Sequence, residues 1–266
     1  MRTHRHAALL AALALIAAQA APAQDAELRI ICSNGFRAAF EKLLPEAERA
    51  SGRKAKVQFG ASRNLKTSIE GGDEFDLAIL TPSQIVQDLA KAGKIAPSTI
   101  VDLASVGIGV AARAGAAKPD VSTVAAIKQT LLAAKAIGYV QVGAATPVVL
   151  EMLDHLGIAQ EVAKKTVYAP GAEQSMKNLA DGKVDLALAP ISEILPAPGV
   201  QLAGPLPAEF QKRVVLSAGI ASATKNRDAA RKFIQALTTA DAAKTIEAAG
   251  MEVPTRTHRL RVERSN

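Results

Sequence analysis

Short apolar runs and amphipathic stretches alternate along the chain, and one combination of them occurs twice. The segment "LKTSIEGGDEFDLAILTPSQI" covers 65–85, and "MKNLADGKVDLALAPISEI" covers 176–194. In each, apolar positions spaced three and four apart lead to a glycine, an Asp-Leu-Ala run and a proline. This pattern predicts the last turns of a helix, a turn and a short buried strand. The same order of elements is therefore expected at two places in the chain.

Apolar spacing in the rest of the chain predicts strands that alternate with helices. The expected strands lie within 27–36, 54–60, 75–80, 103–115, 137–142, 164–171, 184–190 and 213–225. The expected helices lie within 37–52, 62–72, 82–93, 121–136, 143–157, 172–182 and 226–250. The proline-rich stretch 196–207 is expected to be an irregular connection. This alternation indicates an α/β fold with mainly parallel sheets.

The repeated pattern is explained if the chain forms two similar lobes. We predict that 24–106 begins lobe 1, that 107–211 forms lobe 2, and that 212–254 returns to complete lobe 1. The strand patterns at 103–115 and 213–225 are expected to cross between the lobes. Ligands of open α/β sheets bind outside the carboxyl ends of the strands, so two facing lobes predict a ligand cleft. Gly107 and Gly109 lie inside a strand pattern, so they do not indicate a dinucleotide site.

The start of the chain has the pattern of a secretory signal peptide. Arg2 and Arg5 precede an apolar run from Ala7 to Ala18, and small residues follow with cleavage expected after Ala20 or Ala23. The apolar run is shorter than the roughly 20 residues that span a bilayer, which disfavours a membrane anchor. We therefore predict a signal peptide at 1–23 and a periplasmic protein. The arginine-rich end at 255–266 is expected to be a disordered basic tail.

Charge and cysteine content exclude several classes of function. The formal net charge is +7, but the cationic residues are scattered and no aromatic stacking platform accompanies them, so nucleic-acid binding is not expected. The chain has no tryptophan, which disfavours sugar and quaternary-amine sites. Cys32 is the single cysteine and lies in an apolar run, so we expect a buried core residue rather than a reactive thiol.

In the order of its motifs, the sequence resembles the periplasmic molybdate-binding proteins of ABC importers. The resemblance rests on "LRIICSNGFRAAFEKL", "FGASRNLKTSIEGGDEFDLAIL", "VLEMLDHLGI" and "SMKNLADGKVDLALAP", in this order. It implies the two-lobed type II periplasmic binding-protein fold, an α/β fold whose lobes are joined by two crossover strands. It also implies a monomeric, non-enzymatic protein that captures a small anion and delivers it to the membrane permease of an importer.

The resemblance also indicates where a ligand would bind. That family holds a tetrahedral oxyanion with hydroxyls and with backbone N–H groups at helix starts, where the helix dipole favours anions. Carried onto this sequence, the corresponding loops are 33–35, 61–63, 144–146 and 171–173, together with the end of the strand at 184–190. The expected ligand-binding residues are Ser33, Asn34, Gly35, Ser62, Arg63, Ala145, Thr146, Ala172 and Pro190.

Three of these positions depart from the family pattern. Gly35 and Pro190 lack the hydroxyls of the serine and tyrosine that the family places there. Arg63 adds a guanidinium to a loop that is neutral in the family, and its planar fork suits a carboxylate or phosphate. Arg63 either enters the cleft or is an exposed residue that points away from it. The ligand is therefore expected to be a molybdate-like oxyanion or a small carboxylate.

Other chemistry has weaker support in the sequence. A secreted hydrolase or transferase that uses Ser62 or Ser33 would need His155 nearby, and "GASRN" is not a nucleophile elbow. Glu151 and His155 are four residues apart, but without a second histidine or cysteine nearby they indicate a solvated helix face rather than a metal site. We expect no metal and no cofactor. Tyr139 and Tyr168 are expected near strand ends, as core residues or as hydroxyl donors to the cleft.

Overall fold

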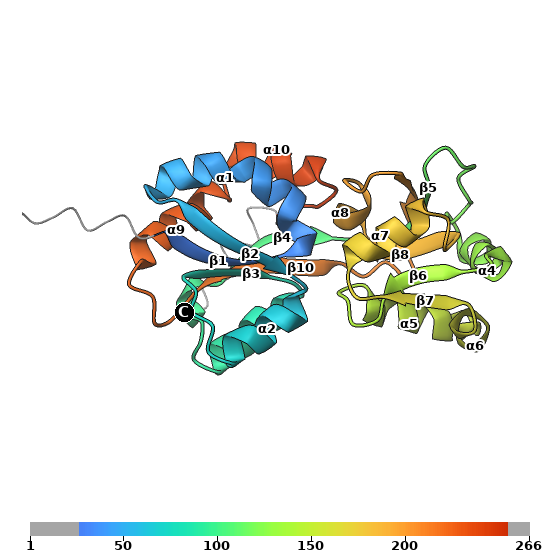
Figure 1. Ribbon diagram of the computed structural model, residues 1–266, viewed down its shortest axis with the longest axis horizontal. Coiled ribbons are helices and arrows are strands. Elements are labelled where there is room, and N and C mark those ends of the chain that lie inside the picture. Colours follow the sequence, from blue (N-terminus) through green and yellow to red (C-terminus); the bar gives the residue numbers. More distant parts are fainter. Residues whose placement is uncertain (1–26, 255–266) are drawn as a thin grey trace, which may run out of the picture.

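The computed structural model describes residues 27–254, which form two lobes arranged side by side along the long axis of the molecule (Figure 1). The expected two-lobed α/β fold is confirmed: each lobe contains a five-stranded sheet with helices packed against it. The signal peptide and the basic tail expected from the sequence lie outside the described residues. Within 27–254, no helix is both long enough and apolar enough to span a bilayer.

The first lobe contains both ends of the described chain. Its strands are β1 (Leu28–Ser33), β2 (Ala55–Gly60), β3 (Leu77–Leu80), β4 (Val101–Val106) and β10 (Val214–Ile220). Its helices are α1 (Arg37–Ser51), α2 (Ser62–Glu70), α3 (Ser83–Lys91), α9 (Arg227–Ala236) and α10 (Ala240–Ala248), with short 3-10 turns η1 (Asn34–Phe36) and η2 (Pro97–Thr99).

The second lobe is formed by the middle of the chain. Its strands are β5 (Ile108–Arg113), β6 (Ile137–Val140), β7 (Thr166–Ala169), β8 (Leu186–Pro190) and β9 (Val200–Pro205). Its helices are α4 (Val124–Ala133), α5 (Thr146–His155), α6 (Ala159–Ala163), α7 (Ala172–Ala180) and α8 (Ile191–Ile194).

The two sheets have the same topology, which accounts for the repeated sequence pattern. Their strand orders are β2-β1-β3-β10-β4 and β7-β6-β8-β5-β9. In each, the first three strands are parallel and the last two run antiparallel to their neighbours. The sheets are thus mixed rather than mainly parallel, because the chain enters each sheet from the other lobe through an antiparallel strand.

The two Asp-Leu-Ala runs occupy equivalent places in the two sheets. Asp76 precedes β3, and its carboxylate accepts the Arg29 backbone N–H of β1 at 2.8 Å. Asp185 precedes β8, and its carboxylate accepts the backbone N–H groups of Lys135 and Ala136, just before β6, at 2.6 and 3.3 Å. Each aspartate therefore fixes the start of the neighbouring parallel strand.

Both faces of each sheet are buried, since successive strand residues point to opposite sides. In β3, Leu77 and Ile79 belong to the large core that contains α1 and α9. Ala78 and Leu80 belong to a second core with α2 and α3. The strands are therefore continuous apolar runs, and the carboxyl ends of β1, β3, β6 and β8 remain free to carry functional loops.

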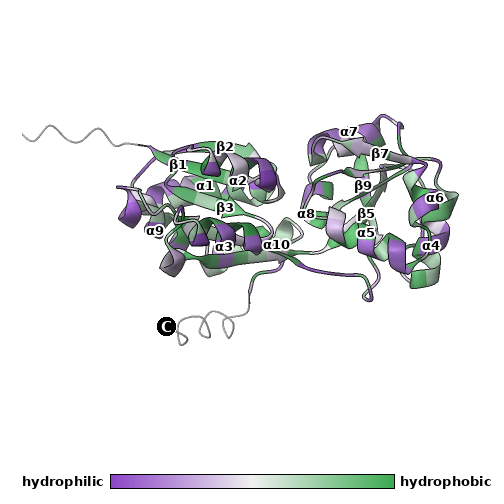
Figure 2. Ribbon diagram, turned by 90° about the horizontal axis from the view of Figure 1, so that it is seen from below, coloured by the Kyte–Doolittle hydropathy of each residue, from purple (hydrophilic) through white to green (hydrophobic). Residues whose placement is uncertain are grey.

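The connections between the lobes differ from the expected crossover strands. The predicted strand at 103–115 is two strands, β4 and β5, and Gly107 lies between them. The Gln211 side chain holds this point: its Oε1 accepts the Ile108 N–H at 2.8 Å and its Nε2 donates to the Ile108 carbonyl at 2.9 Å. A Cβ on Gly107 would lie 3.1 Å from the Gln211 side chain. The two chain segments that connect the lobes thus meet at the contact between Ile108 and Gln211. Figure 2 shows both segments along one side of the molecule.

The stretch 196–207 also differs from the irregular connection expected there, because it contains β9. The prolines of this stretch favoured an irregular connection, so no strand was predicted there. Proline is tolerated in edge strands, where a backbone N–H is not needed for pairing on the open side. β9 is the edge of the second sheet.

Candidate functional site: a cleft between the lobes

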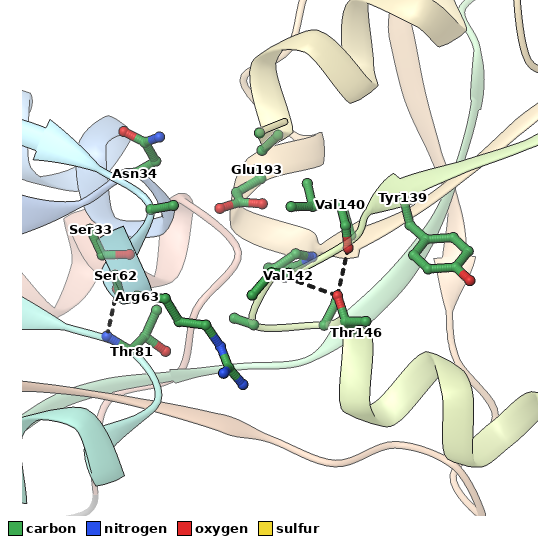
Figure 3. Close-up of a pocket in the computed structure, with 18 of the residues that line it drawn as sticks. Ser33, Asn34, Ser62, Arg63, Thr81, Tyr139, Val140, Val142, Thr146 and Glu193 are labelled. Carbon is green, nitrogen blue, oxygen red and sulfur yellow. Dashed lines mark hydrogen bonds between the residues drawn. The ribbon is translucent and has the colours of Figure 1, made fainter. Parts of the chain in front are cut away.

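A cleft lies between the two lobes, lined by loops that follow strand ends in both. Its cavity volume is about 90 Å³, which suits a small molecule. The structure brings most of the predicted ligand-binding residues to this cleft: Ser33, Asn34, Ser62, Arg63, Ala145, Thr146, Ala172 and Pro190. Figure 3 shows how the side chains of Ser33, Asn34, Ser62, Arg63 and Thr146 are arranged across the space between the lobes.

The two walls of the cleft differ in chemistry. The first lobe contributes polar side chains: Ser33, Asn34, Ser62, Arg63 and Thr81. The second lobe contributes mainly apolar ones: Val140, Val142, Ala145, Pro147, Leu188 and Pro190. A ligand between these walls would therefore meet a cation and hydroxyls on one side, and mainly hydrocarbon together with the Glu193 carboxyl group on the other.

Ser62 is the first residue of α2 and is only 7% exposed. Its hydroxyl oxygen accepts the backbone N–H of Thr81 at 3.1 Å. Because a hydroxyl also carries one hydrogen, Ser62 can still donate that hydrogen to an anion in the cleft. Ser33 is similar: its buried hydroxyl accepts the Gly35 N–H at 3.4 Å.

Arg63 is the second residue of α2, and its side chain extends into the space between the lobes (Figure 3). Among the described residues, its guanidinium has no ion-pair or hydrogen-bond partner. Of the two orientations that the sequence left open, the structure has the one that lines the cleft. The guanidinium is therefore available to a ligand carboxylate or phosphate.

Three helices of nine or ten residues begin at the cleft without a side-chain cap. They are α2, α5 and α7, whose N-cap residues are Ala61, Ala145 and Gly171. The first N–H groups of a helix have no intrahelical partner, and the helix dipole adds positive potential there. Such ends favour an anion.

Thr146 has a different role from the one expected for a ligand-binding hydroxyl. Its Oγ1 donates to the Val140 carbonyl at 2.6 Å and accepts the Gly143 N–H at 3.0 Å. The hydroxyl is thus used inside the loop between β6 and α5. It shapes the loop that presents the start of α5 to the cleft.

Gly35 is the predicted site residue that does not line the cleft directly. It is buried in η1, where a Cβ would lie 3.5 Å from Glu193 Oε1 and 3.7 Å from Ser33 Oγ. Pro190 does line the cleft, but it offers no hydroxyl. Neither Gly35 nor Pro190 therefore offers a side-chain hydroxyl to a ligand.

Glu193 lines the cleft, although it was not among the ligand-binding residues expected from the sequence. It lies in α8, directly after β8, and within 27–254 its carboxylate has no hydrogen bond or ion pair. Burial raises the pKa of this carboxyl to about 7. The signal was present in the repeated segments, where "SEI" in the second occupies the place of "SQI" in the first.

The residues required by a serine hydrolase are not brought together. His155 is the last residue of α5 and packs against Phe210, with ring centroids 5.3 Å apart. It lies nine residues beyond Thr146, or about 13 Å along the helix axis, so it cannot reach the cleft serines. Glu151 pairs with Lys212 at 2.6 Å. No cluster of three potential metal ligands occurs in the described residues.

The two tyrosines form an edge-to-face pair with ring centroids 5.3 Å apart. Tyr139 is 3% exposed and lines the cleft, but its ring extends away from the first lobe in Figure 3. Tyr168 is 49% exposed and is not among the lining residues. Tyr168 therefore does not contribute its hydroxyl to the cleft.

Comparisons with known proteins agree with this architecture. A curated relative from Pseudomonas sp, named aconitate isomerase, is 28% identical over 251 residues, which cover 92% of this chain and 94% of the relative. The periplasmic molybdate-binding protein of Azotobacter vinelandii has the same fold, with a TM-score of 0.74 and 20% identity over 86% of this chain and all of that one.

Two further solved structures share the fold. The sulfate-binding protein SubI of Mycobacterium tuberculosis has a TM-score of 0.70 and 14% identity, covering 87% of this chain and 88% of its own. PEB3 with bound L-phospholactate has a TM-score of 0.68 and 15% identity, covering 86% of this chain and 100% of its own. The family model of bacterial extracellular solute-binding proteins matches residues 28–252, and the chain belongs to this family.

Proposed function

We propose that this protein is a periplasmic solute-binding protein that captures a small carboxylate anion in the cleft and delivers it to the permease of an ABC importer. The observation that carries the proposal is the unpaired guanidinium of Arg63, which lines the cleft beside the uncapped start of α2. An arginine holds a carboxylate through two parallel hydrogen bonds.

The two unlike walls favour an organic acid over a bare oxyanion. A carboxylate would contact Arg63 and the hydroxyl of Ser62, while its carbon skeleton would pack on Val142 and Leu188. A tetrahedral oxyanion would lack two hydroxyls, at Gly35 and Pro190, and would gain little from an apolar wall. The L-phospholactate bound to PEB3 also carries a carboxylate.

Thermal unfolding with a panel of ligands tests this function. Citrate, succinate, cis-aconitate and trans-aconitate would be compared with molybdate, sulfate and phosphate. A bound ligand at a hundred times its Kd stabilises a protein by about 2.7 kcal/mol. We expect such a shift with at least one carboxylate. Stabilisation by the oxyanions alone would contradict carboxylate binding and would indicate that the ligand is a molybdate-like oxyanion.

A second candidate function is isomerisation of an unsaturated polycarboxylate. The free carboxyl group of Glu193 in the cleft and the name of the Pseudomonas relative favour it. Nuclear magnetic resonance of cis- and trans-aconitate incubated with the protein would detect their interconversion. If the two isomers do not interconvert over hours, at a protein concentration that gives full binding, the isomerase function is contradicted and the transport function remains.

A further inference from the structure

Glu193 lies where the second lobe faces the first. α8 follows β8 without a connecting loop, and its Glu193 side chain extends toward Gly35 and the space that Arg63 also enters (Figure 3). A methyl group on Gly35 would lie 3.5 Å from Glu193 Oε1, in ordinary van der Waals contact. Glu193 also lines the cleft, so its carboxyl group faces the ligand space from the second lobe, whereas Arg63 enters this space from the first.

Nothing in the described part of the chain neutralises this carboxyl group. Arg37 and Lys177 line a neighbouring pocket with Glu193, but Arg37 donates to Asn34 Oδ1 at 3.2 Å and Lys177 pairs with Asp181 at 2.9 Å. Burying a carboxylate without a partner is unfavourable, and such groups in clefts are candidates for a functional role. With a pKa raised to about 7 by burial, Glu193 can both release and accept a proton at neutral pH.

We propose that Glu193 is a proton-transfer group that isomerises unsaturated carboxylates in which a CH2 group lies between a carboxylate and a carbon–carbon double bond. This inference rests on the proposed binding of a carboxylate in the cleft. The Glu193 carboxylate takes one proton from the CH2 carbon, so that a C–H bond breaks and an O–H bond forms. The electron pair spreads over the double bond and the adjacent carboxylate.

The same carboxyl group then returns a proton to the far carbon of the original double bond. The double bond moves by one carbon, a new C–H bond forms, and Glu193 is again a carboxylate. Substrate and product have the same formula, so no oxidant, reductant or cofactor is consumed. Arg63 and the uncapped start of α2 stabilise the negative charge that develops on the substrate carboxylate.

Hydrogen exchange in D2O tests the proposal, with trans-aconitate as the probe. In this molecule, movement of the double bond exchanges the CH2 and CH positions of one carbon skeleton and permits conversion to the cis isomer. We expect the wild-type protein to incorporate deuterium at both positions and to form cis-aconitate. Glu193→Gln keeps the shape of the side chain but removes the base, and a general base contributes about 10²–10⁴-fold to rate. Its exchange should fall at least about a hundredfold.

Titration calorimetry with the same probe separates binding from proton transfer. Glu193→Gln should bind trans-aconitate, which shows that the variant is folded. Glu161→Gln is the matched control, because Glu161 is an exposed acid on α6 of the same lobe that does not line the cleft, and it should keep full exchange. Binding with neither deuterium exchange nor formation of cis-aconitate by the wild type, or undiminished turnover by Glu193→Gln, overturns this inference but leaves carboxylate binding standing. If no carboxylate binds the wild type, the proposed function itself is wrong.

Discussion

The Ser62 hydroxyl and the Thr81 backbone N–H form a hydrogen bond of 3.1 Å that joins the start of α2 to the end of β3. Both residues are buried, and both line the cleft. The bond therefore links the end of a core strand of the first lobe to the helix start that carries Arg63.

Removal of this bond should destabilise the protein. In Ser62→Ala the buried N–H of Thr81 loses its partner, which costs about 1–3 kcal/mol of unfolding free energy. Urea denaturation would measure it. Ser68→Ala is the control on the same helix, since the Ser68 hydroxyl bonds to Asp73 at the exposed surface; its effect should stay within about 0.5 kcal/mol. Equal losses in the two variants would contradict this role of Ser62.

Substitutions of Arg63 should act on affinity rather than on stability. Arg63→Ala removes the free cation of the cleft, and truncating a desolvated charged contact costs about 2–5 kcal/mol. The Kd for the carboxylate should rise at least tenfold in titration calorimetry. Arg63→Lys should also weaken binding, because lysine cannot form two parallel hydrogen bonds.

Lys66→Ala is the control for Arg63. Lys66 lies one turn further along α2 and pairs with Glu70 at 2.8 Å, away from the cleft residues. Its loss should leave affinity unchanged. Affinity retained in Arg63→Ala would mean that the guanidinium makes no contact with the ligand.

The two equivalent aspartates should differ in their effect on stability. Asp76 is 1% exposed and also accepts hydrogen bonds from Thr224 Oγ1 at 2.6 Å and Asn226 Nδ2 at 3.3 Å. Asp185 holds the start of its neighbouring strand from an exposed position. Asp76→Ala leaves several buried donors without an acceptor and should cost roughly 3–5 kcal/mol, against about 1–2 kcal/mol for Asp185→Ala. Guanidinium denaturation would compare them, and equal costs would contradict the prediction.

Glycine substitutions should distinguish the η1 turn, which has room for a methyl group, from the tightly packed strand β10. A Cβ on Gly35 would meet its neighbours at 3.5 Å or more, so Gly35→Ala should fold with a stability change below about 1.5 kcal/mol. A Cβ on Gly219, in β10, would lie 2.6 Å from Ile95 Cγ2, and Gly219→Ala should therefore cost about 1–3 kcal/mol or more. Thermal unfolding would rank the two variants. If Gly35→Ala were the less stable of the two variants, η1 and α8 would be packed more tightly than these distances indicate.

The raised pKa of Glu193 predicts a dependence of stability on pH. Because the folded-state pKa of about 7 exceeds the ordinary 4.5, the folded protein holds the proton more tightly than the unfolded chain does. This contribution is complete below about pH 4.5 and is lost as pH rises through about 7, which amounts to at most about 3 kcal/mol. Glu193→Gln is neutral at every pH and should not show this loss.

Urea denaturation between roughly pH 5 and pH 8 would measure the difference between Glu193→Gln and the wild type. The advantage of the variant should grow up to about pH 7 and then level off. The other ionisable side chains that line pockets with Glu193 are Arg63 and Tyr139 in the cleft, and Arg37, Glu41, Glu173, Lys177 and Asp181 in the neighbouring pocket. Parallel curves for the two proteins would contradict the raised pKa.

Much of the architecture was determined by the sequence itself. Apolar periodicity reports which residues of a strand or helix are buried, and that burial is a local property of the chain. The two Asp-Leu-Ala runs therefore predicted two similar lobes, with loops of Ser62 and Ala172 at strand ends and helix starts. The edge strand β9 was missed, because its prolines are compatible with an edge but give no strand signal.

Only the tertiary structure decided which loops share the cleft and what they present to it. Arg63 and Glu193 are 130 positions apart in the chain, and no local pattern states that both extend into one space. The unpaired state of each is also a tertiary property, since a charge is free or paired according to the neighbours that packing brings within reach. Periodicity records burial along one element, whereas a ligand site depends on the distances between several elements. The chemistry of this cleft is therefore determined by which side chains the two lobes bring together.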